Sequence, residues 1–173
     1  MDQLIFDNQN WGYYTSLDIS SSDNTAHVIQ FSHSGYYLNY STDEGGCWTN
    51  SNISGSGTYY HYPTLTVDNV GIPHILTSQL SNNDGTLRHW YINASDVWEN
   101  ETITSDSNGH CNIVFNDNVL YGIYVNQNGE LKLIVKENDN WQSEIIDSGF
   151  LSGSRTQSVA MLYEGALARF SAF

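Results

Sequence analysis

The sequence predicts an all-β protein and, within that class, a small β-propeller of about four blades. Two observations carry this prediction. Apolar segments recur about every 46–48 residues along a chain of 173 residues. Each segment is followed by a polar turn and by a second apolar segment. A repeat of this length that holds about four short strands is typical of a propeller blade.

The first two strands of each repeat are predicted to form an antiparallel hairpin. First strands are expected at residues 16–20, 64–68, 112–116 and 158–162. Second strands are expected at residues 27–31, 74–77, 121–124 and 168–170. The turns between them are rich in Asn, Asp and Gly, which adopt the backbone conformations that tight hairpin turns require.

Third and fourth strands complete three of the four repeats. Third strands are expected at 37–40, 87–91 and 131–135, and fourth strands at 52–54, 101–104 and 144–147. Between them a tryptophan recurs, at Trp48, Trp98 and Trp141. Because aromatic burial stabilises small sheets, these indoles are expected to pack where neighbouring blades meet. The three complete blades span about 16–54, 64–104 and 112–147.

The fourth blade is predicted to be divided between the two ends of a single domain, residues 1–173. Residues 158–173 provide a first and a second strand, and residues 3–7 provide a closing strand that matches either a third or a fourth strand. One strand is then missing. The ring could close within one chain, or two chains could share strands in a ring of about eight blades. A neighbouring subunit could also add a strand at the open edge, giving an oligomer or filament.

Charge and composition exclude several classes of partner. The formal net charge is −14 and the chain has five basic residues, so clustered phosphate contacts to nucleic acid are not expected. No run of about 18 apolar residues predicts a membrane span. The charge is typical of a soluble secreted protein, and an extracellular or cell-surface location is predicted, although no signal sequence is visible. Cys47 and Cys111 fall at opposite ends of a blade and are not expected to form a disulfide.

A short motif surrounds the first of the recurring tryptophans. Residues 41–48 read Ser-Thr-Asp-Glu-Gly-Gly-Cys-Trp, which fits the pattern Ser-X-Asp-X-Gly-X-X-Trp at Ser41, Asp43, Gly45 and Trp48. In this the chain resembles the Asp-box, or bacterial neuraminidase repeat, proteins, which are sialidase-like β-propellers. The wider repeat is also similar to repeats of archaeal and bacterial surface-layer and secreted proteins. The resemblance implies a structural turn at the outer edge of a blade; it indicates the fold and says little about catalysis.

Catalysis is not expected, although a degenerate sialidase-like glycosidase is one alternative. The sialidases that the chain resembles hold the substrate carboxylate with three arginines and use a tyrosine nucleophile paired with a glutamate. The three arginines here, Arg88, Arg155 and Arg169, lie at different positions of the repeat. No pair of carboxylates is marked out by its spacing as a glycosidase pair.

One rim of the predicted propeller is rich in aromatic side chains. It is formed by the loops that lead into first strands and by those that join second to third strands. The candidate ligand-binding residues there are Trp11, Tyr13, Tyr14, Tyr36, Tyr59, Tyr60, His61, Tyr62, His110 and Arg155. Aromatic faces and polar edges suit sugars, so a lectin-like protein that binds a glycan or cell-surface polysaccharide is predicted. The alternative is that these tyrosines fill the mouth of a narrow channel.

Two further expectations concern function. A structural or assembly subunit of a cell surface, virion or extracellular filament is the second functional hypothesis. No cofactor or metal is predicted, because the weakly Ca²⁺-like Asp84 is explained by a hairpin turn. His27 and His74 occupy the same position of the repeat, which indicates a structural hydrogen bond rather than catalysis.

Overall fold

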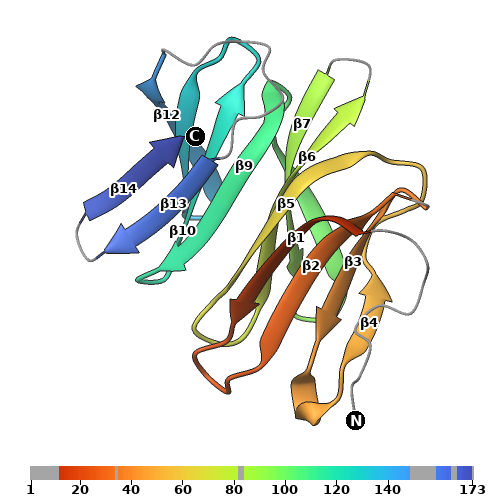
Figure 1. The fold of residues 1–173 in the computed structure, drawn as a ribbon. Coiled ribbons are helices and arrows are strands. Elements are labelled where there is room, and N and C mark those ends of the chain that lie inside the picture. The colour runs from red at the N-terminus through yellow and green to blue at the C-terminus, as the bar shows by residue number, and fades with distance from the viewer. Residues whose placement is uncertain (1–11, 34, 82–83, 149–158, 165–166, 173) are drawn as a thin grey trace.

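The computed structural model describes residues 12–33, 35–81, 84–148, 159–164 and 167–172. These residues form β-strands joined by turns, with one 3-10 turn, η1 (Glu44–Gly46). Within them, three antiparallel sheets have four strands each and a last sheet has two (Figure 1). The prediction of an all-β protein is therefore confirmed. The predicted closing strand at 3–7 lies outside the described residues.

Each sheet uses consecutive strands of the chain. Sheet 1 comprises β1 (Gly12–Ile19), β2 (Ala26–Ser32), β3 (Tyr37–Thr42) and β4 (Thr49–Asn52). Sheet 2 comprises β5 (Tyr60–Val67), β6 (Pro73–Ser81), β7 (Asp84–Ile92) and β8 (Trp98–Thr104). Sheet 3 comprises β9 (Ser107–Asn116), β10 (Val119–Asn126), β11 (Leu131–Glu137) and β12 (Asn140–Asp147). Sheet 4 comprises β13 (Val159–Glu164) and β14 (Leu167–Ala172).

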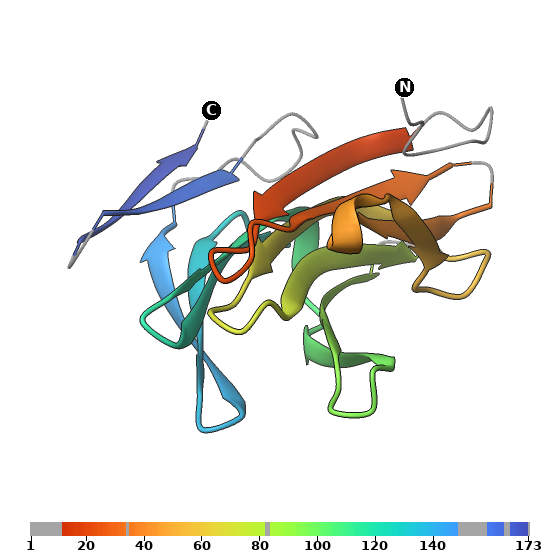
Figure 2. The same ribbon diagram turned by 90° about the horizontal axis from the view of Figure 1, so that it is seen from below.

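The sheets pack against one another in chain order through their first strands. β1 lies against β5, β5 against β9, and β9 against β13. Figure 1 shows β1, β5 and β9 toward the middle of the molecule, with β4 and β12 on its outside, and Figure 2 shows the same strands from below. Over the described residues no sheet closes on itself. The first strands of sheets 1 to 3 thus lie side by side, and each of these sheets extends outward from its first strand.

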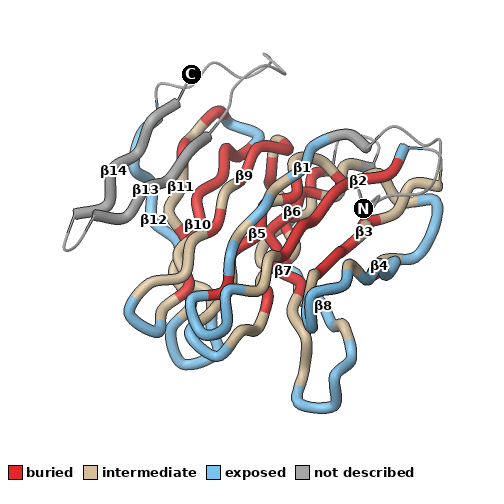
Figure 3. The backbone as a smooth tube through the Cα atoms, turned by 60° about the horizontal axis from the view of Figure 1, so that its bottom comes forward, coloured by how far each residue is buried: buried red, intermediate tan, exposed pale blue. Residues whose placement is uncertain are grey.

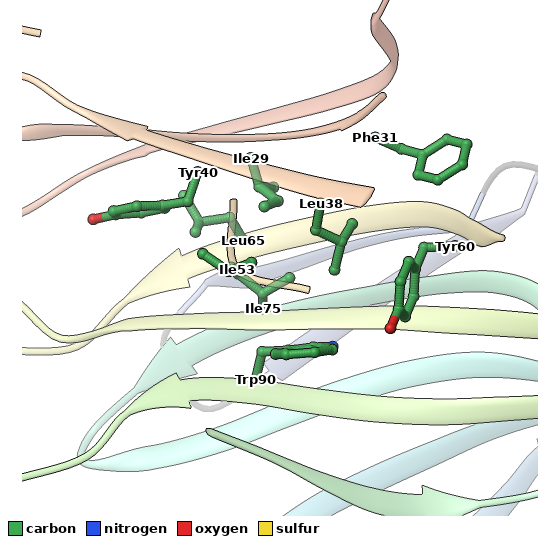
Figure 4. Packing of buried hydrophobic residues seen from close by; sticks show 9 residues of the cluster. All are labelled: Ile29, Phe31, Leu38, Tyr40, Ile53, Tyr60, Leu65, Ile75 and Trp90. Atoms are coloured by element: carbon green, nitrogen blue, oxygen red, sulfur yellow. The ribbon is translucent and has the colours of Figure 1, made fainter. Parts of the chain in front are cut away.

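Apolar side chains fill the space between neighbouring sheets. Between sheets 1 and 2 the core consists of Ile29, Phe31, Leu38, Tyr40, Ile53, Tyr60, Leu65, Ile75 and Trp90 (Figure 4). Between sheets 2 and 3 it consists of Leu76, Leu87, Cys111, Ile113, Leu120, Tyr124 and Ile134. A smaller group, Ile123, Val125 and Leu131, is buried on sheet 3. Figure 3 shows the buried residues concentrated along the inner and middle strands, with exposed residues at the turns.

Two of the recurring tryptophans join neighbouring sheets. Trp98 of sheet 2 has its ring centroid 4.9 Å from that of Tyr40 in sheet 1. Trp141 of sheet 3 lies 5.4 Å from His89 of sheet 2, edge to face. Tyr40 and His89 occupy equivalent positions in their third strands, because each lies two residues before the partner of a second-strand histidine. The prediction that these indoles pack between repeats is confirmed for Trp98 and Trp141.

Polar side chains of one first strand bond to the backbone of the next. Asp18 Oδ2 accepts from Val67 N at 2.8 Å, and Ser16 Oγ accepts from Leu65 N at 3.1 Å. One repeat later, Thr66 Oγ1 accepts from Phe115 N at 3.1 Å. Asp18 and Thr66 are equivalent, since they pair with His27 and His74. These bonds fix the register of neighbouring first strands.

The turn that resembles an Asp-box ties the outer part of sheet 1 together. Asp43 Oδ1 accepts a hydrogen bond of 2.6 Å from Ala26 N, at the start of β2. Gly46 N donates to Asp43 O at 2.8 Å, and Gly45 has φ 72°, which favours glycine. Ser41 Oγ donates to the side chain of Asn50 on β4. Asp43 and Ser41 therefore have structural partners in the turn, in β2 and in β4.

The repeated histidine position makes the structural hydrogen bond that the sequence predicted. His27 Nδ1 bonds to the hydroxyl of Tyr40, and His74 Nδ1 bonds to His89 Nε2 at 2.9 Å. In both sheets the partner comes from the equivalent place on the third strand. Both histidines thus link a second strand to a third.

Candidate functional site

The first strands begin earlier than predicted, and this changes where the rim aromatics lie. β1 begins at Gly12, β5 at Tyr60 and β9 at Ser107, so residues expected in loops belong to strands. Each strand has an irregular register near its start, between Tyr13 and Thr15 in β1, for example. Such a bulge breaks the two-residue alternation of strand side chains. The apolar pattern therefore becomes regular only after the bulge.

Three tyrosines have left-handed backbone conformations, two of them at these irregularities. Their φ angles are 58° for Tyr14, 51° for Tyr36 and 47° for Tyr62. Large side chains seldom adopt positive φ, and each such residue costs on the order of 1–3 kcal/mol. Tyr14 and Tyr62 lie in the register shifts of β1 and β5. At these bulges the rings of Tyr14 and Tyr62 contact one another instead of following the regular alternation of strand side chains.

Tyr14, Tyr62 and His110 occupy the same position of three successive repeats, and their rings contact one another in that order. The ring centroids of Tyr14 and Tyr62 are 4.2 Å apart. Those of Tyr62 and His110 are also 4.2 Å apart, with nearly parallel planes at 24°. Because β1, β5 and β9 lie side by side, the repeat brings the three rings into one row.

Four more rings extend this row. Tyr59 lies 4.9 Å from His61 and 5.1 Å from Tyr36, and His61 lies 6.1 Å from Tyr14. His33 lies 5.7 Å from Tyr59. The seven rings form one surface, here named the aromatic band: Tyr14, His33, Tyr36, Tyr59, His61, Tyr62 and His110.

Exposure varies along the aromatic band. Tyr14 is 37% exposed and His33 is exposed, while Tyr36, Tyr59, His61 and Tyr62 are half-buried. His110 is buried, and burial lowers the pKa of its imidazole. Because the rings pack against one another, the band offers phenol hydroxyls and imidazole edges, together with the exposed part of the Tyr14 ring. This combination suits a ligand that is rich in hydroxyl groups.

The other candidate ligand residues do not belong to the aromatic band, and some of them lie outside the described residues. Tyr60 is 5% exposed and packs edge to face on Trp90 in the core, where burial raises the pKa of its hydroxyl. Its side chain faces sheet 1 because it begins a strand instead of ending a loop. Trp11 and Arg155 lie outside the described residues, and Tyr13 is described by its backbone pairing in β1. Asp84, which was expected in a hairpin turn, is the first residue of β7.

A second polar network, which the sequence did not reveal, joins sheets 2 and 3. Glu101 Oε1 accepts from His89 Nδ1 at 2.8 Å, from Lys136 Nζ at 2.7 Å and from Trp141 Nε1 at 2.9 Å. His89 in turn bonds to His74, whose Nε2 lies 3.6 Å from Asp68 Oδ2. We name this chain from Asp68 to Lys136 the Glu101 network. In the sequence this network is visible only as a histidine, a glutamate and a lysine that lie within three different strands.

The charges of this network are set by burial and by hydrogen bonds. The hydrogen bond from His89, with those from Lys136 and Trp141, holds the pKa of Glu101 at about 2. Burial lowers the pKa of His74 to about 4, and the neighbouring His89 adds to this. Burial also lowers the pKa of His89. At neutral pH the two histidines are therefore neutral and Glu101 is ionised.

We expect stability to fall on acidification in two steps. Between pH 6.5 and about 4 the unfolded chain binds protons that His74 does not bind when folded, so unfolding becomes more favourable as pH falls. Between about pH 4.5 and 2 the contribution of ionised Glu101 is lost as well. Thermal unfolding midpoints from pH 7 to 3 measure this. A midpoint that stays constant down to pH 4 would contradict the first step.

The described part of the chain gives no support for a metal site, a membrane-spanning helix or a cysteine nucleophile. There, no group of three or more His, Cys, Asp or Glu side chains is arranged to hold a metal ion. No helix among the described residues is long and apolar enough to cross a membrane. Cys111 is a buried free thiol whose pKa burial raises to about 12, so it is a poor nucleophile. Arg88 bonds to Gln79 and Asn100 within sheet 2.

Comparison with known proteins adds no relative. No family model matches the sequence. No curated protein matches it either. The functional argument therefore rests on the residues and on their arrangement.

Proposed function

We propose that the protein is an extracellular, non-catalytic carbohydrate-binding protein built as a small propeller, with a glycan bound along the aromatic band. The observation that carries the proposal is the row formed by Tyr14, Tyr62 and His110. Three successive repeats place a ring at the same position, and the rings meet at 4.2 Å. A surface made by each repeat in the same way can bind a ligand that also repeats, such as a polysaccharide.

The propeller architecture is supported by the way in which the sheets succeed one another. Inner first strands, equivalent hydrogen bonds between them and equivalent indole contacts recur from sheet to sheet. Leu17 of β1 is 59% exposed, although Leu65 and Ile113 at the same position are buried against the preceding sheet. A fourth sheet packed on sheet 1 would bury Leu17 in the same manner and close the ring.

The chemistry of the band favours a neutral glycan. With a net charge of −14, the protein repels polyanions at low ionic strength. Tyrosine hydroxyls and imidazole nitrogens can donate to and accept from sugar hydroxyls, and an outer ring face can contact sugar C–H groups. Backbone strain at Tyr14, Tyr36 and Tyr62 supports a functional role, because such strain concentrates at binding sites.

Replacing Tyr14 by alanine is expected to weaken glycan binding about tenfold, which corresponds to about 1.4 kcal/mol. Tyr14 is the exposed ring at the end of the row, so its removal should leave the core intact. The test is a glycan array of neutral and acidic oligosaccharides, followed by calorimetric titration of the best neutral one.

Tyr91→Ala is the matched control, because Tyr91 is a half-buried tyrosine on β7 that bonds to Glu99 and lies outside the band. This variant should bind the glycan as the unaltered protein does. An array without a bound glycan, or equal weakening by both variants, would contradict the proposal.

A structural or assembly role remains the second proposed function. It is favoured by the two-stranded sheet 4, whose β14 lies at an edge among the described strands. An assembly subunit would form ordered contacts between copies and would bind no glycan on the array.

A further inference from the structure

The Glu101 network contains a pair of histidines, His74 and His89, whose proton positions are fixed by their neighbours. Lys136 Nζ and Trp141 Nε1 can only donate, and they lie 2.7 Å and 2.9 Å from Glu101 Oε1. Donors to a carboxylate favour its ionised form. His89 Nδ1, 2.8 Å from the same oxygen, must therefore carry a proton and donate it. In a neutral His89 ring the other nitrogen, Nε2, is then an acceptor.

The same reasoning fixes the proton of His74. Its Nδ1 lies 2.9 Å from His89 Nε2, so a neutral His74 ring donates from Nδ1. The ring planes differ by 13° and the centroids are 5.1 Å apart, which fits two rings that meet edge to edge around one N–H···N bond. The remaining nitrogen of His74, Nε2, carries no proton and lies 3.6 Å from Asp68 Oδ2. At neutral pH two protons thus serve the four ring nitrogens of the histidine pair.

A single added proton fits the histidine pair without breaking a bond. On His74 Nε2 it would face the carboxylate of Asp68. The proton between the rings can then lie on either nitrogen, so the positive charge is shared between a ring beside Asp68 and a ring beside Glu101. Burial and the ammonium of Lys136 oppose this charge, and the two carboxylates favour it.

The groups around the histidine pair come from both sheets. Among the described residues, the titratable and charged ones are Asp68 after β5, Tyr91 on β7, Glu101 on β8 and Lys136 on β11. Phe115 of β9 lies 6.4 Å from His74 with planes 5° apart, and Trp141 of β12 meets His89 edge to face. The rings of the pair therefore form part of the contact between sheets 2 and 3.

A second added proton cannot be accommodated. It would enter between the rings, where two N–H groups would point at one another across 2.9 Å without an acceptor. Two adjacent imidazolium rings beside Lys136 would also repel one another. The side chain of His74 is 14% exposed and can turn toward water, whereas that of His89 is 1% exposed. Turning His74 outward removes its contact with Phe115 of sheet 3.

We propose that the histidine pair is an acid-sensitive element in the contact between sheets 2 and 3. It takes up one proton intact, and a second proton expels His74 and loosens the contact locally, before the chain unfolds. The contact between sheets 1 and 2 stays closed under the same conditions. This inference does not depend on the glycan.

The equivalent pair in sheet 1, His27 and Tyr40, explains why the effect is confined to one contact. His27 Nδ1 bonds to the hydroxyl of Tyr40, which can either donate or accept. Protonation of His27 therefore leaves this bond in place. Tyr40 packs on Trp98 of sheet 2, and a phenol gains no positive charge in acid.

Two backbone amides report on the two contacts. Phe115 N donates to Thr66 Oγ1 across sheets 2 and 3, at 3.1 Å. Leu65 N donates to Ser16 Oγ across sheets 1 and 2, also at 3.1 Å. Both acceptors are hydroxyl groups, which acid does not protonate in this range. A change in hydrogen exchange at either amide therefore reports separation of its two sheets.

The first measurement is nuclear magnetic resonance of the unaltered, nitrogen-15-labelled chain from pH 7 down to acid unfolding, with amide hydrogen exchange at each pH. At pH 7 both rings of the pair should carry their proton on Nδ1. The Phe115 amide should stay protected through uptake of the first proton and lose protection at least about tenfold with the second, while the Leu65 amide stays protected. A ring protonated on Nε2 at pH 7, or loss of protection at both amides at the same pH, would overturn the proposal.

The second measurement uses His89→Tyr, which gives sheet 2 the residue that sheet 1 has at the equivalent place. In this variant the Phe115 amide should stay protected in acid until the whole chain unfolds. Acid-dependent loss of protection at Phe115 equal to that of the unaltered chain would contradict the role of the pair. If this variant does not fold, the first measurement still decides the proposal, because it uses the unaltered chain.

A third measurement locates the first proton with Asp68→Asn. Asparagine keeps an acceptor for the turn amides of Val70 and Ile72, but it removes the charge that faces His74 Nε2. The pKa of His74, which burial already lowers to about 4, should fall further, by about one unit. Glu99→Gln is the matched control, because Glu99 bonds to Tyr91 and Asn93 in exposed positions. An equal pKa of His74 in both variants would contradict the position assigned to the first proton.

Discussion

Gly85→Ala is expected to destabilise the protein by about 4 kcal/mol, or to prevent folding altogether. Gly85 lies in β7, opposite Leu80 of β6. A Cβ atom at this position would be 1.6 Å from the carbonyl oxygen of Ser107 and 2.6 Å from its carbonyl carbon. The obstacle is backbone, which cannot rotate away as a side chain could. Sheets 2 and 3 would have to separate at the start of β9.

The measurement is urea unfolding of Gly85→Ala beside a matched control, Gly55→Ala. An alanine Cβ at Gly55 meets nothing within 4 Å, and the residue has no positive φ. The control should therefore change the free energy of unfolding by no more than about 0.5 kcal/mol. If Gly85→Ala is as stable as the control, β7 and β9 do not approach as closely as the structure shows.

Glu101→Ala is expected to have the next largest effect, a loss of about 3 kcal/mol. Its carboxylate accepts hydrogen bonds from three side chains on two sheets. Without it, the Nδ1 of His89, which is 0% exposed, and the ammonium of Lys136 lose their shared acceptor. The free energy of unfolding at pH 7 measures the loss. The same variant should also remove the stability change between pH 4.5 and 2.

Glu99→Ala provides the control, because Glu99 is a glutamate of the same strand. It bonds to Tyr91 and Asn93 in exposed positions of sheet 2. Exposed contacts of this kind contribute little, so a change below about 1 kcal/mol is expected. Equal losses in the two variants would mean that the Glu101 network does not hold sheets 2 and 3 together.

The strand order was predictable because strand signals are local. Tight turns, a second apolar run after each first one and a recurring tryptophan each occur within a few residues of chain. The structure contains the second, third and fourth strands near the expected places, such as β6 at Pro73–Ser81 and β11 at Leu131–Glu137. The packing of Trp98 and Trp141 between sheets followed from the same repeat.

The starts of the first strands were not predictable because bulges hide them. At Tyr14 and Tyr62 the alternation breaks, so the residues before it look like loop. Consequently Tyr60 was expected on the rim although it lies in the core. His33 was missing from the candidate ligand residues although it belongs to the aromatic band.

The Glu101 network could not be predicted because it depends on contacts across sheets. His89, Glu101 and Lys136 come from three different strands. Their spacing along the chain fits no local motif, and only the packing of sheet 2 on sheet 3 joins them. Long-range polar contacts of this kind require the fold to be known.

The hydrogen bonds between first strands also determine where this molecule comes apart. In a linear array each repeat is stabilised by its own sheet and by its contacts with its neighbours, so opening spreads from the weakest junction. Asp18 and Thr66 each accept a backbone hydrogen bond from the following repeat. Opening the array between β1 and β5 breaks the hydrogen bonds to Ser16 and Asp18, and opening it between β5 and β9 breaks the bond to Thr66. Separating neighbouring repeats therefore costs polar contacts between their first strands as well as the apolar packing of their sheets.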